Sequence, residues 1–220
     1  MAEGDMLVRC FTGGVFSQNA YLVTCTGSSS GILIDPGAAV GEMLSLVERE
    51  AISIQAIILT HAHLDHLEGV ARAKRELAVP VKLTRADEPL YHAAAAQAQQ
   101  FGMTIETLPP VDEFLEMNEV VNFGDCALTV RPAPGHSPGH VILVGDGAAL
   151  VGDCIFAGSI GRTDLPGGDL SVLMNSIRTE ILTLGEETVL YSGHGPETTV
   201  GHERATNPFL NPNLGGSTFA

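Results

Sequence analysis

Three histidines and one aspartate lie close together in the segment Thr60–His66. The segment follows a short apolar run, Ala56–Leu59, which is typical of a buried strand. It precedes Leu67–Leu77, where apolar side chains recur at helical spacing. Open α/β sheets place their chemistry at the carboxyl ends of strands, in the loop before the next helix. We therefore expect a strand, a ligand-bearing loop and a helix here, rather than a loop whose histidines only cap and solvate.

The composition excludes some classes of partner. Of the 220 residues, 45% are hydrophobic and 17% are charged, which is typical of a well-packed globular protein. The formal net charge is −15, and the only lysines are Lys74 and Lys82. Nucleic acids and acidic membrane surfaces both require clustered basic residues, so we expect neither partner. Bound divalent cations would offset part of the negative charge.

The ends of the chain and its cysteines bear on the cellular compartment. Met1–Asp5 is acidic and lacks the apolar core of a signal peptide, and no apolar stretch approaches about 20 residues. Cys10, Cys25, Cys126 and Cys154 are scattered, without a Cys-x-x-Cys motif. We expect a cytoplasmic protein with reduced, mostly buried cysteines. A disulfide framework is the alternative, but a chain this large and apolar does not need one.

Both halves of the chain contain short strands followed by helices. In the first half these are, in order, the strands Met6–Cys10, Ala20–Cys25 and Gly31–Asp35, the helix Val40–Glu50, the strand Val81–Thr84 and the helix Glu88–Phe101, besides the central strand and helix. Beyond Pro109-Pro110 they are the strands Glu119–Phe123, Cys126–Arg131, His140–Val144 and Ala148–Val151, the helix Leu170–Leu182 and the strand Thr188–Ser192.

The order of these elements predicts an α/β fold. The spacing of the first three strands indicates an antiparallel meander. Two halves packed sheet to sheet, with their helices outside, would form a four-layer αββα sandwich. No low-complexity linker divides the chain, so we expect one domain spanning residues 1–220.

Three turns rich in Gly and Pro in the second half add candidate ligands. They are Pro134–His140, Gly152–Cys154 and Ser192–Pro196. Asp153 and His194 each end a short apolar strand, and His136 lies just past one. If the sheets bring these strand ends to the first cluster, the site contains five imidazoles and two carboxylates. That number is enough for two metal ions with open positions for water.

The spacing of the ligands suggests how two ions would share them. His61 and His63 are two residues apart, so in an extended segment they point the same way, and His136 could complete their ion. The ligands of the second ion would be Asp65, His66 and His194.

Two carboxylates are the candidate catalytic residues, Asp65 and Asp153. Asp153 has two oxygens and could bridge the ions, which would lie about 3.5–4 Å apart and share a hydroxide that it orients. Nitrogen and oxygen ligands without a thiolate favour two divalent ions, with Zn²⁺ the first choice and Fe or Mn the alternatives.

The motif His-x-His-x-Asp-His, followed by Gly-His, Gly-Asp and a final Gly-His, resembles the metallo-β-lactamase superfamily. The resemblance covers nearly the whole chain and implies the αββα fold and the seven ligand positions. Leu59–His66, Ala133–His140 and Gly161–Asp164 are similar to the glyoxalase II branch, the hydroxyacylglutathione hydrolases. Gly193–Thr198 and Glu203–Pro208 resemble its short, single-domain bacterial members.

The implied reaction is hydrolysis of a small-molecule thioester such as S-lactoylglutathione. Long members of the branch carry a C-terminal helical domain that contacts glutathione. Only residues 195–220 follow His194, so we expect no such domain, and the choice of thiol stays open. No motif indicates an oligomeric state.

Two other functions fit part of the pattern. Persulfide dioxygenases also resemble this chain and bind one iron, which would map to His61, His136 and Asp153. Against that assignment, those enzymes have Asp-Tyr where this chain has Gly195-Pro196. A metal-stabilised binding protein without turnover is the third alternative.

Two further residues have two interpretations each. The resemblance suggests that Arg162 binds a substrate carboxylate, and the alternative is an ion pair with Asp164 or Asp169 that fixes the loop. The resemblance also suggests that Asp35 orients a metal-bound imidazole, while its position before Pro36 is typical of a turn. His140 is expected either to be structural or to support a metal ligand from behind.

Overall fold

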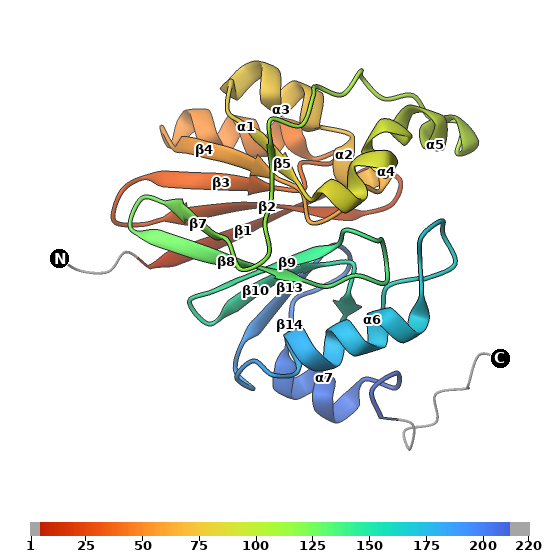
Figure 1. Ribbon diagram of the computed structural model, residues 1–220. Helices are drawn as coiled ribbons and strands as arrows, with labels where there is room; N and C mark the ends of the chain where they lie inside the picture. Colours follow the sequence, from red (N-terminus) through yellow and green to blue (C-terminus); the bar gives the residue numbers. More distant parts are fainter. Residues whose placement is uncertain (1–4, 212–220) are drawn as a thin grey trace.

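The computed structural model describes residues 5–211, which contain two six-stranded sheets that face each other (Figure 1). The strands of the first sheet are, in spatial order, β1 (Met6–Gly13), β2 (Gln18–Cys25), β3 (Ser30–Ile34), β4 (Ser53–Ile58), β5 (Val81–Leu83) and β6 (Glu113–Phe114). As predicted, β1, β2 and β3 form an antiparallel meander. The later strands β4, β5 and β6 then add in parallel, which requires helical crossovers between them.

The second sheet comes from the second half of the chain. Its strands are, in spatial order, β14 (Thr198–Thr199), β13 (Val189–Ser192), β10 (Ala148–Gly152), β9 (Val141–Gly145), β8 (Cys126–Pro132) and β7 (Val120–Phe123). Only the β10–β13 pair is parallel. A separate hairpin of β11 (Ile155–Phe156) and β12 (Ser159–Ile160) follows β10.

Helices cover the outer face of each sheet. The first-half helices are α1 (Val40–Arg49), α2 (Leu64–Leu67), α3 (Val70–Leu77), α4 (Glu88–His92) and α5 (Ala94–Gln100). Those of the second half are α6 (Leu170–Ser176), which continues into a π-helical turn Ile177–Ile181, and α7 (Val200–Thr206). Figure 1 shows α1 and α3 on one outer side and α6 and α7 on the other, so the predicted four-layer αββα sandwich is confirmed. No helix among residues 5–211 is long and apolar enough to cross a membrane.

Alternation along the central strands builds the layers. Leu22, Leu33 and Ile57 pack in the cluster beneath the helices of the first half. Their sequence neighbours Val23 and Ile58 pack in the cluster between the two sheets. Because successive side chains of a strand point to opposite faces, a strand buried on both faces is expected to be mostly apolar. This is why the central strands read as continuous apolar runs.

Two of the predicted helices are broken in the structure. Leu67–Leu77 is interrupted at Gly69, whose amide donates to the carbonyl of Pro36. A Cβ at Gly69 would lie 2.5 Å from the Gly37 carbonyl oxygen, so the close approach of the two loops requires glycine there. Glu88–Phe101 is divided at Ala93 into α4 and α5. The short strands β6, β11, β12 and β14 were not predicted, because two residues carry no periodicity.

The prediction of four reduced cysteines is wrong for one pair. Cys25, at the end of β2, forms a disulfide with Cys126, at the start of β8, with 5.6 Å between their Cα atoms. The residues are 101 positions apart, and only the packing of the sheets brings them together. Cys10 is free and exposed, and Cys154 is free and buried. The prediction of one domain over residues 1–220 extends beyond the described residues and stays a prediction.

Reduction of this disulfide should lower the free energy of unfolding by about 2–4 kcal/mol, because a cross-link across a long loop restricts the unfolded chain. Denaturant unfolding with and without a phosphine reductant measures the change. A Cys25→Ser/Cys126→Ser double variant is the control, and its unfolding midpoint should not respond to the reductant. Equal midpoints for the wild-type chain under both conditions would contradict the prediction.

Candidate metal centre

Side chains from four distant segments meet at one end of the sandwich. His61 and His63 follow β4, Asp65 and His66 lie in α2, His136 lies in the β8–β9 loop, Asp153 follows β10 and His194 follows β13. Three of these residues group tightly as His61, His63 and His136, and three others as Asp65, His66 and His194, with the possible ligand atoms of each group within 4.8 Å of one another. These are the two sets proposed from the sequence.

Asp153 lies between the two groups. Its Oδ2 is 3.5 Å from His136 Nε2 and 3.5 Å from His194 Nε2, while its Oδ1 is 3.4 Å from His66 Nε2. Ligand atoms about 2.0–2.2 Å from one tetrahedral ion are about 3.4 Å apart. The spacing of these atoms therefore suits shared metal ions better than direct hydrogen bonds.

Four of the imidazoles have one nitrogen fixed by an acceptor. His66 Nδ1 donates to Asp35 Oδ2 at 2.9 Å, and His61 Nδ1 donates to Thr60 Oγ1 at 3.0 Å. His136 Nδ1 donates to the carbonyl of Arg162 at 2.7 Å, and His194 Nδ1 to that of Phe16 at 3.1 Å. An Nδ1–H that is engaged in this way leaves the lone pair on Nε2, the tautomer that binds a metal.

Three buried atoms at the centre have no hydrogen-bond partner among the described residues. They are His61 Nε2, His66 Nε2 and Asp153 Oδ1. A buried polar atom without a partner costs about 1–3 kcal/mol, so a cluster of three favours a bound cation at this place. Nitrogen and carboxylate oxygen atoms aimed at one space fit divalent cations, and the residues present therefore fit two ions of the kind predicted.

The charge states of the metal-free cluster follow from burial and from the neighbours. Burial and the nearby His66 hold the pKa of His61 well below its usual value. Burial would also lower the pKa of His66, but Asp65 and Asp153 outweigh it and raise the pKa well above the usual value. Burial would raise the pKa of Asp153, yet His66 and His194 hold it well below its usual range. The carboxylates are therefore ionised, as metal ligands must be.

Asp35 lies at a turn and contacts the ring of His66, while its role toward a metal-bound imidazole stays a prediction. It ends β3 with a positive φ of 47°, a conformation that Asp tolerates in turns. Its carboxylate accepts from the backbone amide of Thr60 at 2.7 Å and the Thr60 hydroxyl at 2.6 Å as well as from His66. The turn therefore fixes the orientation of the His66 ring.

Other predicted residues lie as follows. His140 is buried, its Nε2 accepts from the Asp153 amide at 3.0 Å, and Cys154 Sγ lies 3.4 Å from its Nδ1, so its place is structural. The guanidinium of Arg162 makes two 2.7 Å hydrogen bonds to Asp164, on the surface, which matches the loop-fixing alternative. Arg162 also lines the cavity at the metal centre, so a role toward substrate stays a prediction.

Sequence reasoning missed three residues that hold the cluster. Asn19 donates from its side chain to the carbonyls of Ser192 and Gly195, at 3.0 and 2.8 Å, and so fixes the loop of His194. Phe16 supplies the acceptor for His194. The Asp87 carboxylate accepts hydrogen bonds from the loop of His61 and His63 and from the loop of His136. Asp87 follows β5 at the edge where the other strands place ligands, a position that could have marked it, whereas nothing local marks Phe16 or Asn19.

A cavity of about 200 Å³ opens onto the candidate metal centre. Its floor is His63, Asp65, Asp153 and His194, and its apolar walls include Phe16, Leu64, Phe101 and Leu165. The rings of Phe16 and Phe101 meet edge to face, with their centroids 5.4 Å apart. The cavity can seat a small, partly apolar group next to the carboxylates and imidazoles.

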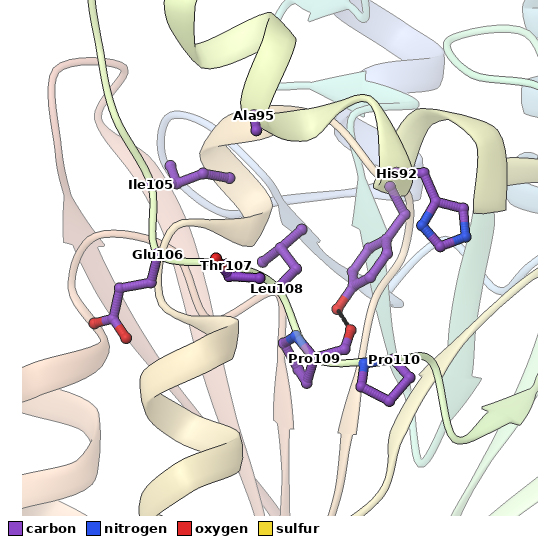
Figure 2. A pocket seen from close by; sticks show the side chains of 9 residues that line it. His92, Ala95, Ile105, Glu106, Thr107, Leu108, Pro109 and Pro110 are labelled. Atoms are coloured by element: carbon purple, nitrogen blue, oxygen red, sulfur yellow. Dashed lines mark hydrogen bonds between the residues drawn. The ribbon is translucent and has the colours of Figure 1, made fainter.

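A second cavity, of about 380 Å³, lies away from these histidines, between α4, α5 and the segment Ile105–Pro110 (Figure 2). The Tyr91 hydroxyl donates to the Pro109 carbonyl at 2.9 Å. The carboxylate that lines this cavity, Glu106, pairs with Arg75. None of the metal-type clusters among residues 5–211 lies in it. We therefore assign the chemistry to the first cavity.

The fold and the cluster define a class of proteins, αββα sandwiches with a two-ion His/Asp site at one end. Residues 13–194 match the family model of the metallo-β-lactamase superfamily, and the chain belongs to that superfamily.

Several relatives lie close in sequence and structure. The chain is 34% identical to hydroxyacylglutathione hydrolase GloC of Haemophilus influenzae, over 89% of this chain and 94% of that protein. It is 41% identical to TTHA1623, solved in a di-iron-bound form, with a TM-score of 0.84 over 92% of this chain and 100% of that one. It is 34% identical to the BLEG-1 B3 metallo-β-lactamase, with a TM-score of 0.84 over 93% of this chain and 100% of that one.

Proposed function

We propose that this chain is a metal-dependent hydrolase of thioesters such as S-lactoylglutathione. One observation carries the proposal: four imidazoles, each with Nδ1 engaged outside the cluster, converge with two carboxylates next to one cavity. His61, His63 and His136 would hold one divalent ion, and Asp65, His66 and His194 the other. Asp153 would contact both, with Zn²⁺ the first choice and Fe or Mn the alternatives.

Two bound divalent ions would lower the pKa of water to near 7 and so supply a hydroxide nucleophile at neutral pH. Asp153 Oδ2, between His136 and His194, is placed to hold the proton of the attacking water and to aim its oxygen at the carbonyl carbon. The Phe16 and Phe101 rings line the same cavity as Asp153. A thiolate is a good leaving group and needs no general acid. Among the described residues, the groups at the cavity that could donate a proton are these carboxylates and imidazoles.

Two considerations support thioester hydrolysis over the alternatives. The relative named hydroxyacylglutathione hydrolase covers most of both chains at 34% identity. A mononuclear iron at His61, His136 and Asp153 would leave Asp65, His66 and His194 without a role, although they cluster within 4.8 Å. That second group favours the two-ion hydrolase over a persulfide dioxygenase.

The test is an activity panel on protein reconstituted separately with Zn²⁺, Fe²⁺ and Mn²⁺, with metal content measured on each sample. We expect two ions per chain and hydrolysis of S-lactoylglutathione or of another thioester. Full occupancy without turnover of any thioester would overturn the proposal. Oxygen consumption with glutathione persulfide in the iron sample would favour the dioxygenase, and faster cleavage of a β-lactam would place the chain with the named lactamase.

If Arg162 binds a carboxylate of the substrate, Arg162→Ala should raise KM by about tenfold and leave kcat unchanged, since a guanidinium–carboxylate contact contributes about 1.5 kcal/mol. Asp164→Asn is the matched variant, because it frees the same guanidinium from its partner and should not raise KM. Steady-state kinetics with a glutathione thioester measures both. An Arg162→Ala enzyme with unchanged KM would show that the residue only fixes its loop.

A further inference from the structure

We propose that Asp87 is a positioning residue for the first metal ion, since it sets the spacing between the loop of His61 and His63 and the loop of His136. The proposal rests on the two-ion site proposed above. Asp87 lies after β5, at the end of a single 3₁₀ turn, Arg85–Asp87, and it does not line the cavity at the candidate metal centre.

The Asp87 carboxylate joins the two loops directly. It is fully buried, and its Oδ2 accepts from the backbone amide of Ala62 at 3.0 Å and from the Ser137 hydroxyl at 2.7 Å. Its Oδ1 accepts from the backbone amide of Gly139 at 2.6 Å. Ala62 lies between His61 and His63, and Ser137 follows His136. One carboxylate therefore bonds the residues adjacent to all three ligands of the first group.

The loop of His136 is seated closely on the turn that carries Asp87. The Thr84 hydroxyl donates to the Gly139 carbonyl at 2.6 Å. A Cβ at Gly139 would lie 2.3 Å from Thr84 Oγ1 and 2.9 Å from Asp87 Oδ1, so only glycine allows this approach. A buried carboxylate is stable only when donors satisfy it, and here three donors do so. The same three bonds keep the loops at one separation.

The second group is held by other residues. His66 donates to Asp35, and His194 donates to the Phe16 carbonyl. Among the hydrogen bonds of residues 5–211, none joins Asp87 directly to His66, Asp65 or His194. Loss of Asp87 should therefore weaken binding of one of the two ions much more than that of the other.

Asp87→Asn keeps the shape, removes the negative charge and replaces one acceptor oxygen with an NH₂ donor. Whichever way the amide is turned, its NH₂ group faces either the Ala62 or the Gly139 amide, and two donors then oppose each other. One loop must move away. Residues that orient metal ligands typically contribute 10–100-fold to metal affinity, and we expect a loss of that size for one ion.

Titration of Co²⁺ into the metal-free protein, followed by its visible absorption and by calorimetry, tests this without turnover. Wild type should bind two ions, and Asp87→Asn should bind one as wild type and the other about 10–100-fold more weakly. Ser137→Ala removes a single donor and should weaken that same ion by about fivefold, the equivalent of one hydrogen bond.

Glu203→Gln is the matched control. Glu203 is also a fully buried carboxylate with three donors, the Gly158 amide, the Thr198 hydroxyl and the Asn207 amide group, but it bonds no ligand loop. This variant should lose stability and bind both Co²⁺ ions as wild type.

Unchanged binding of both ions in Asp87→Asn, or an equal loss in Glu203→Gln, would overturn the proposal. If Asp87→Asn does not fold, the Ser137→Ala titration decides, and wild-type affinities there would overturn it. A wild-type protein that binds no Co²⁺ would instead overturn the proposed function, on which this inference rests.

Discussion

Asp153→Asn should lower kcat for thioester hydrolysis by about three orders of magnitude or more while the protein stays folded. Asp153 lies within 3.5 Å of ligand atoms from both metal groups, with Oδ1 toward His66 and Oδ2 toward His136 and His194. The amide lacks the charge that balances the two cations and cannot accept a proton from water. Loss of a group that stabilises or orients the reacting atoms commonly costs about 10²–10³ in kcat, and here a bridging ligand is lost as well.

Steady-state kinetics on metal-reconstituted protein measures this effect, together with metal content and circular dichroism. Asp125→Asn is the control, because it makes the same change on an exposed turn between β7 and β8 and should leave kcat as in wild type. An Asp153→Asn enzyme that retains wild-type kcat at equal metal content would remove Asp153 from the proposed chemistry.

The fold was accessible from the sequence because its layers depend on alternating apolar residues. Runs such as Ala56–Leu59 and the meander of β1 to β3 follow from burial on one or both faces of a strand. The breaks at Gly69 and Ala93 were not accessible, since each depends on a loop from elsewhere in the chain or on local packing. The Cys25–Cys126 bond was missed for the same reason.

The candidate site shows the same division. The seven proposed ligands stood out because His and Asp residues cluster at the ends of predicted strands, several of them in glycine-rich turns. The structure brings all seven together. Their supports did not stand out. Asn19 and Phe16 act on His194 from the opposite end of the chain, and Phe16 acts through a backbone carbonyl, which any residue possesses.

The metal-free protein should be most stable near pH 6.5 and lose stability on both sides. Burial and the nearby His136 lower the pKa of His63 to about 4. Because the unfolded chain binds this proton at about 6.5 and the folded chain does not, stability is lost as the pH falls from 6.5 toward 4. At about 1.4 kcal/mol for each pH unit, His63 alone contributes a loss of about 3 kcal/mol. The pKa values of His61, His136 and His140 are lowered too, mainly by burial, and add to it.

Above pH 6.5 the sign is reversed. Burial would lower the pKa of His194, but the nearby carboxylates of Asp153 and Asp65 outweigh burial and raise it to about 10. The pKa of His66 is raised by Asp65 and Asp153. A raised pKa adds stability that is complete below 6.5 and is lost as the pH approaches 10.

Chemical denaturation of chelator-treated protein from pH 4 to pH 10 measures the profile. His63→Asn should reduce the loss on the acid side, whereas the same change at His92, which is exposed on α4, should not. Saturating Zn²⁺ should raise stability through the neutral range, because it binds only the folded chain. A profile without a maximum, or one that His63→Asn leaves unchanged, would contradict the assigned charge states.

The position of the disulfide has a consequence for how the sandwich can open. Cys25 pairs in register with Ser30 at the start of β3, whereas Asp35 and the ligand cluster follow the end of that strand. The disulfide and the candidate metal centre therefore lie at opposite ends of the two sheets. If ions bind there, complete separation of the two sheets would require both reduction of the disulfide and removal of the ions.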